Sequence, residues 1–265
     1  MRTHRRVPRA RTVVCAGEVT LIWARGQECG TLEAMRIVVC VKHVPDMQSE
    51  RRFEGGRLVR GEDDVLNELD ENAIEAAVQL KESEEDAGRE AEVIALTMGP
   101  EDAEDALMRA LQMGADRAFL VSDEFLEGSD VITTASVLSV AIAKISDECG
   151  PVDLVVTGMA SLDAMTSMLP GALAAKAHMP LLGLARTLSV EDGVATIERS
   201  VDGFTETLRA ALPAVVSVTD QINEPRYPAF AAMKAARKKP LDQWGIDDLV
   251  EVPGGQDLVM RRALT

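Results

Sequence analysis

Residues 35–42 read MRIVVCVK, an apolar run rich in β-branched side chains that is typical of a strand buried on both faces of a parallel sheet. Three similar runs follow, AEVIALTMG (91–99), DRAFLVSD (116–123) and VDLVVTGM (152–159). Stretches with the helical spacing of apolar residues lie between and around them, at 66–85, 101–115 and 129–149. Because strands and helices alternate at this pace, the sequence predicts βαβ units and an α/β, doubly wound parallel sheet.

Beyond Pro180 the pattern changes. RTLSVEDGVATIERSV (186–201) consists of two alternating runs around Glu-Asp-Gly, which is a hairpin signal, and 203–220 adds two more short strands. We therefore expect a main domain over 35–220 with an added β-hairpin region. Two smaller segments follow it, 221–241 and 242–265.

The first 34 residues differ from the rest. They contain six Arg and three Glu, which leaves a net charge of −19 for residues 35–265. A basic start before VVCAGEVTLIWA resembles an export signal, but Glu18 interrupts the apolar stretch and no cleavage site follows cleanly. A transit peptide is an alternative. The favoured interpretation is that Met35 is the true start and that residues 1–34 are a leader that adds nothing to the fold.

Composition excludes several classes of protein. The formal net charge is −16, and a surface this acidic repels phosphate backbones, so we expect no nucleic-acid partner. The four cysteines, at 15, 29, 40 and 149, show no C-x-x-C spacing and are typical of reduced thiols in a cytoplasmic prokaryotic protein. No apolar run reaches the ~18–20 residues of a membrane-spanning helix, so we expect no membrane insertion.

The sequence offers no set of catalytic residues. Its three histidines, at 4, 43 and 178, do not suggest a triad, and no cluster suggests a metal site. G-x-x-x-x-G-K-[ST] is absent, and no G-x-G-x-x-G follows an expected strand, which disfavours P-loop enzymes and NAD-dependent oxidoreductases. We expect a protein that is not an enzyme.

Ligands of doubly wound sheets bind outside the carboxyl ends of the strands. Three loops qualify: the one after Cys40, the one at 98–100, and the one from Gly158 onward. GMASLDAMTSMLPGALAAKA (158–177) combines small hydroxyl residues with a following helix, which suits a phosphate, and Asp163 could bind a ribose or adenine. The alternative is a capped β–α turn. The segment 67–70 is interpreted as a helix cap with one core leucine.

The stretch NEPRYPAFAAMKAARKK (223–239) has two open interpretations. Two prolines bracket Arg226 and Tyr227, and a basic run follows. A backbone fixed by proline can present an apolar anchor to a partner at low entropic cost. A rigid loop before a helix with a basic solvent face explains the pattern equally well.

Six segments taken in order resemble the β subunit of electron transfer flavoproteins, the family that includes FixA-type proteins. They are VCVKHVPD (39–46), LNELDENAIEAAVQLKE (66–82), ALQMGADRAFLV (110–121), GMASLDAMT (158–166), DGFTETLRAALPAVVSV (202–218) and NEPRYPAFAAMKAARKKPL (223–241). The resemblance implies a Rossmann-like fold related to adenine-nucleotide α-hydrolases. It also implies a heterodimer with an α subunit that holds most of a shared FAD, and an AMP that is bound without being turned over.

The resemblance also implies site residues. Carried onto this chain, the AMP positions are Cys40, Asn67, Glu68, Leu69, Asp70, Met98, Gly158, Met159, Ala160, Ser161, Leu162, Asp163, Ala164, Met165, Thr166, Ser167, Met168 and Leu169. Asp163 and Thr166 would be polar contacts, and Leu69 would also lie near the flavin. Many relatives read D-G-D-T-G-Q-V where this chain reads D-A-M-T-S-M-L at 163–169, so the glycines of that pattern are absent here.

The stretch 221–241 would be a recognition loop and helix that docks dehydrogenases, and 242–265 would be a C-terminal arm on the α subunit. The docking residues carried over are Arg226, Tyr227, Pro228, Phe230 and Met233, with Phe230 where the family usually has leucine. The implied function is electron transfer from flavin dehydrogenases, such as the acyl-CoA dehydrogenases of fatty acid oxidation, to a quinone oxidoreductase or similar acceptor. Alternatives are a bifurcating FixA-type subunit with a second FAD, and a stand-alone adenine-nucleotide-binding stress-type module.

Overall fold

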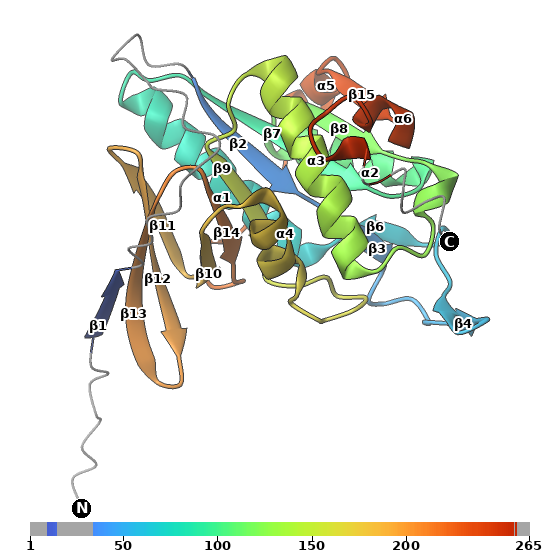
Figure 1. The fold of residues 1–265 in the computed structure, drawn as a ribbon, viewed down its shortest axis with the longest axis horizontal. Helices are drawn as coiled ribbons and strands as arrows, with labels where there is room; N and C mark the ends of the chain where they lie inside the picture. The colour runs from blue at the N-terminus through green and yellow to red at the C-terminus, as the bar shows by residue number, and fades with distance from the viewer. Residues whose placement is uncertain (1–9, 15–33, 257, 259–265) are drawn as a thin grey trace, which may run out of the picture.

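A seven-stranded parallel sheet forms the centre of the computed structural model, which describes residues 34–256 and 258 and the backbone of residues 10–14. The strand order is β10-β14-β9-β2-β7-β8-β15, and every neighbouring pair is parallel (Figure 1). In that order the strands are Leu181–Ala185, Ala214–Val218, Leu154–Gly158, Met35–Cys40, Ala91–Met98, Arg117–Val121 and Leu241–Trp244. The chain runs outward from β2 through β7 to β8 and then returns to the other side of β2 as β9. The predicted α/β, Rossmann-like doubly wound parallel sheet is confirmed.

Helices cover both faces of this sheet (Figure 1). They are α1 (Glu68–Asp86), α2 (Glu104–Met113), α3 (Val131–Cys149), α4 (Leu169–Ala177), α5 (Phe230–Ala236) and α6 (Ile246–Leu249), with short 3-10 helices at Glu101–Ala103 and Glu124–Leu126. Side chains alternate along each strand: Ile37 and Val39 pack with α1 and α2, whereas Val38 and Cys40 pack with α3, α4 and α6. Two separate cores result, one on each face.

Local signals set the helix ends as expected at two places. The Asp130 carboxylate accepts a hydrogen bond of 2.7 Å from the Thr133 N–H, so it caps α3. Gly114 follows the last residue of α2. The exception is Asn67, which holds the cap position of α1 but makes no side-chain cap bond there. Its amide instead forms hydrogen bonds with the loop after β9.

A second sheet of order β1-β13-β12-β11 packs beside the α1 face. Its strands are, in that order, Ala10–Val14, Phe204–Ala211, Val194–Val201 and Thr187–Glu191. The predicted hairpin is confirmed, since β11 and β12 are antiparallel and joined at Asp192 and Gly193, which both have positive φ as a type I′ turn requires. The expectation that residues 1–34 add nothing to the fold is wrong for Ala10–Val14, which pair in parallel with β13. Residues 1–9 and 15–33 lie outside the described residues.

Several strands were not expected. The polar loop after β2 contains two small antiparallel pairs, β3 (His43–Pro45) with β6 (Asp64–Leu66) and β4 (Phe53–Glu54) with β5 (Arg57–Leu58). Leu241–Trp244, which join the predicted recognition segment 221–241 to the predicted C-terminal arm 242–265, form the edge strand β15. There Trp244 stacks on Phe119 with ring centroids 4.3 Å apart. The arm's contact with an α subunit remains a prediction.

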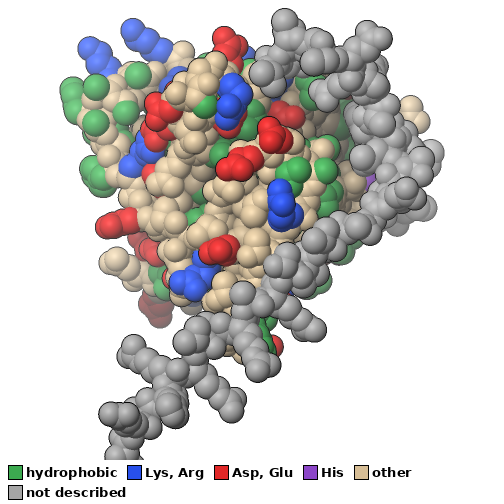
Figure 2. Space-filling model, turned by 90° about the vertical axis from the view of Figure 1, so that its left-hand side faces the viewer, with side chains coloured by type: hydrophobic (Ala, Val, Ile, Leu, Met, Phe, Trp, Pro, Cys, Tyr) green, Lys and Arg blue, Asp and Glu red, His purple; other side chains and the backbone are tan. Residues whose placement is uncertain are grey.

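On the face shown in Figure 2, the coloured acidic, basic and apolar side chains are interspersed rather than gathered by kind. Among the helices of the described residues, none has the length and apolar character needed to cross a membrane.

Candidate functional site

The switch in strand order lies between β2 and β9, where open α/β sheets bind their ligands. The two strands are in register there, with Cys40 opposite Thr157. Because both strands are parallel, the loops after Cys40 and after Gly158 leave the sheet at the same edge. The first turn of α1 packs against this edge, since Leu69 and Asp70 lie directly over Gly158. Three of the predicted segments therefore meet.

Asn67 ties α1 to the loop after β9. Its buried amide nitrogen donates to the Ala160 carbonyl at 3.0 Å, and its amide oxygen accepts from the Leu162 N–H at 3.0 Å. Asn67 holds the predicted cap position of α1, but its side chain does not cap the helix and instead fixes the path of residues 160–162. Paired hydrogen bonds of this kind give a buried amide a defined position.

Asp70 is a buried carboxylate at the junction of β2, α1 and β9. The N–H of Lys42 donates to it at 2.9 Å, and a Cβ on Gly158 would lie 2.5 Å from its Oδ1, so glycine is required for this close approach. Burial raises the pKa of Asp70 to about 7, although hydrogen bonds from Asn67 and from the N–H groups of Lys42 and Gly158 oppose the rise. This carboxyl therefore keeps its proton to a higher pH than an exposed aspartate does.

Asp163 is held by two cations. Lys42 Nζ lies 2.8 Å from its carboxylate, and the Arg60 guanidinium also binds it. The Asp163 side chain is only 1% exposed. Burial would raise its pKa, but the hydrogen bonds from Lys42 and Arg60 outweigh burial and hold the pKa well below its usual range. The three charges sum to +1, so this corner of an acidic protein is locally favourable to an anion.

Cys40 and Thr157 lie side by side on the α3 and α4 face of the sheet. Burial, and then the charge of Asp70, raise the pKa of Cys40 to about 12, so its thiol is a small apolar wall and no nucleophile. The buried Thr157 hydroxyl has no hydrogen-bond partner among the described residues. A buried hydroxyl without a partner costs about 1–3 kcal/mol, and a polar ligand at the end of β9 would satisfy it. The residues present therefore fit a nucleotide at this edge.

The loop between Asp163 and α4 is exposed. Met165 and Ser167 have left-handed backbones (φ 50° and 52°), which is uncommon for residues other than glycine. Helix α4 begins at Leu169 with no side-chain cap bond, so Thr166 and Ser167 are not the caps that the alternative interpretation of this segment required. Their hydroxyls face solvent at the helix start, where an anion would bind.

The docking stretch divides into two kinds of side chain. Tyr227 and Phe230 are 85% and 81% exposed. Pro228 is buried and Met233 is partly buried. Arg226 turns inward and forms ion pairs with Glu75 and Glu82 of α1. Two predicted docking residues are thus free to meet a partner, whereas the guanidinium of Arg226 is engaged within the chain.

Comparison with known proteins agrees with this architecture. The family described as electron transfer flavoprotein domain matches residues 56–249. The chain is 43% identical over 206 residues to electron transfer flavoprotein subunit beta of Mycobacterium leprae, covering 77% of this chain and 76% of that protein. The chain belongs to the electron transfer flavoprotein β-subunit family. It is also similar to protein FixA of Azorhizobium caulinodans (36% identical, 77% and 73% covered) and to the caffeyl-CoA reductase-Etf complex subunit CarD of Acetobacterium woodii (33% identical, 81% and 80% covered).

Membership of the electron transfer flavoprotein family makes this chain an electron transfer subunit of the β or FixA type, and flavin involvement follows from the family. Electron transfer subunits of this family fit a non-catalytic role. Within residues 34–256 and 258, the His, Cys, Asp and Glu side chains form no group of three that could hold a metal ion.

The structure assembles part of the predicted nucleotide site in this β-type chain. Eight predicted residues come together at the β2–β9 edge: Cys40, Asn67, Leu69, Asp70, Gly158, Ala160, Leu162 and Asp163. By contrast, the Glu68 side chain is exposed on α1, and Met98 packs partly buried against the α3 core. Sequence reasoning missed Lys42, Arg60 and Thr157. Only Lys42 had a signal, because it is the charged last residue of the predicted strand 35–42.

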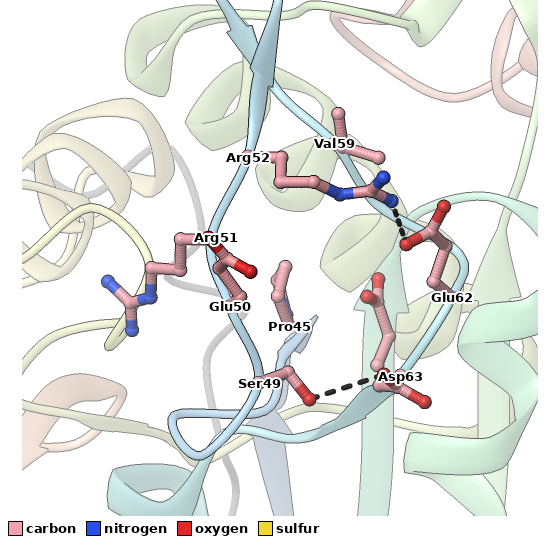
Figure 3. Close-up of a pocket in the computed structure, with 9 residues that line it drawn as sticks. Pro45, Ser49, Glu50, Arg51, Arg52, Val59, Glu62 and Asp63 are labelled. Atoms are coloured by element: carbon pink, nitrogen blue, oxygen red, sulfur yellow. Dashed lines mark hydrogen bonds and ion pairs between the residues drawn. The ribbon is translucent and has the colours of Figure 1, made fainter.

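A surface pocket of about 450 Å³ lies beside this site, in the segment that carries the small hairpins. Its lining is Pro45, Ser49, Glu50, Arg51, Arg52, Val59, Glu62, Asp63 and Asp64. Figure 3 shows Arg52 turned toward Glu62 across it, while Arg51 points away. The Arg51 guanidinium donates a hydrogen bond to the Leu162 carbonyl at 3.0 Å, so a residue that lines the pocket also holds the loop after β9. The pocket shares none of the predicted nucleotide residues.

Proposed function

We propose that this chain is the β subunit of a heterodimeric electron transfer flavoprotein. Together with an α subunit it would share a FAD, and it would bind an AMP as a structural nucleotide. It would carry electrons from flavin dehydrogenases, such as acyl-CoA dehydrogenases, to a quinone oxidoreductase or similar acceptor. The FAD supplies the electron-accepting and electron-donating chemistry when bound.

The observation that carries the proposal is the β2–β9 edge. It combines a loop fixed by Asn67, a cation pair at Asp163, and a buried Thr157 hydroxyl without a partner. In this assignment Lys42 and Arg60 provide positive potential for a phosphate, Asp163 orients those two cations, and Thr157 donates to or accepts from the ligand. The apolar wall of Cys40 excludes water from the same edge.

Co-expression with an α subunit tests the heterodimer. We expect a yellow complex whose visible spectrum shows bound flavin, and AMP in the nucleotide extract of the denatured complex. A second equivalent of FAD in place of AMP would favour the bifurcating FixA-type alternative. A monomer that binds ATP without an α subunit would favour the stress-type module and contradict the proposal.

Phe230→Ala tests the docking stretch. An aromatic anchor of this exposure typically contributes about 1–2 kcal/mol to a protein interface, so we expect electron transfer from an acyl-CoA dehydrogenase to slow by roughly tenfold. The FAD content should not change. Phe53→Ala, which removes another exposed phenylalanine, on the β4–β5 hairpin, is the matched control and should have little effect. Loss of flavin from Phe230→Ala would contradict the docking role.

A further inference from the structure

Arg226 is the most fully engaged side chain of the docking stretch. Its Nε and Nη2 donate to Glu75 at 2.7 and 3.1 Å, and its Nη1 and Nη2 donate to Glu82 at 2.6 and 3.0 Å. Its backbone N–H also donates to Glu75, at 3.1 Å. All three guanidinium nitrogens are therefore directed at helix α1, away from any partner that docks on Tyr227 and Phe230.

Glu75 explains why this contact is strong. Its side chain is only 4% exposed, and burial alone would raise its pKa. The hydrogen bonds from Arg226 outweigh burial and lower the pKa, so Glu75 is a buried charge that needs this guanidinium. The bidentate geometry fixes Arg226 in orientation as well as in distance.

A second contact fixes the same loop three residues earlier. The Asn72 amide donates to the carbonyl and to the side-chain oxygen of Asn223, at 3.2 and 3.1 Å, and the Asn223 amide donates back to the Asn72 carbonyl at 3.0 Å. Asn72 is buried on α1. Residues 223 and 226 are thus both fastened to one helix, and we call this set of contacts the α1 clamp (Asn72, Glu75, Glu82, Asn223 and Arg226).

The α1 clamp ends where the exposed aromatics begin. Tyr227 follows Arg226 directly, and Arg109 of α2 lies over its ring at 5.6 Å. Pro225 and Pro228 restrict the backbone on either side. A loop held in this way presents Tyr227 and Phe230 in one orientation, which lowers the entropy lost when a partner binds.

The geometry points to Arg226 as a positioning residue: together with Asn72 and Glu75 it holds the docking aromatics in place, and it does not itself contact the redox partner. This inference rests on the proposed docking function of 223–239. It differs from the interpretation of the sequence, in which Arg226 was one of the residues that meet the partner.

The test uses the co-expressed α/β complex and a purified acyl-CoA dehydrogenase as the electron donor. Arg226→Ala should raise the KM for the dehydrogenase about tenfold with kcat nearly unchanged, because a misplaced anchor weakens docking more than it alters the transfer step. Amide hydrogen exchange in 223–230 should increase. Arg226→Lys, which keeps the charge but loses the bidentate geometry, should recover part of the KM.

Asn72→Ala keeps the test decisive if Arg226→Ala fails to fold. Since Asn72 is buried on α1, a docking partner does not reach its side chain, and a raised KM in this variant with unchanged FAD and AMP contents reports the position of the loop. Arg237→Ala is the matched control, because it removes one exposed arginine of the same segment without breaking the α1 clamp.

The outcomes separate this inference from the proposed function. A raised KM in Phe230→Ala, Arg226→Ala and Asn72→Ala, with Arg237→Ala near the parent, supports both. A raised KM in Phe230→Ala alone overturns the inference and leaves the docking function standing. An equal rise in Arg237→Ala and Arg226→Ala also overturns it, because charge alone would then explain the effect. An unchanged KM in Phe230→Ala refutes the docking function itself.

Discussion

Gly158→Ala is the sharpest perturbation of the β2–β9 edge. The new methyl group would lie 2.5 Å from Asp70 Oδ1 and 2.8 Å from the Leu69 carbonyl oxygen, and the second of these belongs to backbone that cannot rotate away. Overpacking of this kind costs about 1–3 kcal/mol. Moving Asp70 also weakens its hydrogen bond from the Lys42 N–H, and a hydrogen bond to a charged group contributes about 1.5–3 kcal/mol. We expect a loss of about 3–5 kcal/mol.

The assay is urea unfolding of the chain alone and of its complex with an α subunit at fixed protein concentration, because a bound partner raises apparent stability. For a chain of this size the loss corresponds to a fall in Tm of roughly 10 °C. AMP retained after purification should fall as well. Gly171→Ala in α4 is the control: nothing lies within 4 Å of its new methyl group, so helix propensity should stabilise it by about 0.5–1 kcal/mol. A Gly158→Ala protein within 0.5 kcal/mol of the parent, by the usual spread of surface substitutions, would refute the packing argument.

Three further predictions concern the same edge. Asn67→Ala leaves the Ala160 carbonyl and the Leu162 N–H without their partner, so stability should fall by about 2–3 kcal/mol in urea unfolding; unchanged amide exchange at 160–162 would contradict this. The low pKa of Asp163 stabilises the fold above the unfolded-state pKa of about 4, and this stabilisation is lost as pH falls through the folded-state pKa. The advantage of the parent over Asp163→Asn should therefore shrink between pH 6 and pH 3, and an advantage that grows on acidification would be inconsistent with this sign. Thr157→Val removes a buried hydroxyl without a partner, so the nucleotide-free chain should gain about 1 kcal/mol while the AMP retained falls; AMP retention equal to the parent would remove Thr157 from the site.

The central strands could be predicted because strands buried on both faces leave continuous apolar runs. β2, β7, β8 and β9 all show this pattern. The two edge strands do not: β10 is interrupted by Gly183, and in β15 the side chains of Asp242 and Gln243 are exposed. Edge strands are covered on fewer sides, so their composition reports little about their structure.

The position of the candidate site in the fold could be predicted, but the contacts of its individual residues could not. Parallel strands and the return of the chain to β9 dictate which loops meet, and the resemblance named residues in them. What decides their roles is contact over long sequence separation, which no local pattern records. Asn67 was interpreted as a cap because Asn is common there, yet its partners lie at 160 and 162. The resemblance predicts Arg226 as a docking residue, yet the carboxylates that bind it lie on α1. A faint signal existed in the polar residues 72, 75 and 79, whose spacing of three and four puts them on one side of a helix.

Helix α1 carries the predicted nucleotide residues Leu69 and Asp70 in its first turn and the α1 clamp further along. From Asp70 to Glu82 it rises about 18 Å at 1.5 Å per residue. A helix of this length moves nearly as a rigid rod. A tilt at its first turn therefore displaces the α1 clamp by an amount that grows with the distance from the first turn. The displacement is passed on to Tyr227 and Phe230, which the α1 clamp holds. The packing of the first turn of α1 and the position of the α1 clamp are therefore mechanically coupled. A change that loosens the packing of Asp70 against Gly158 would widen the range of positions that Tyr227 and Phe230 occupy, although the docking stretch does not touch the β2–β9 edge.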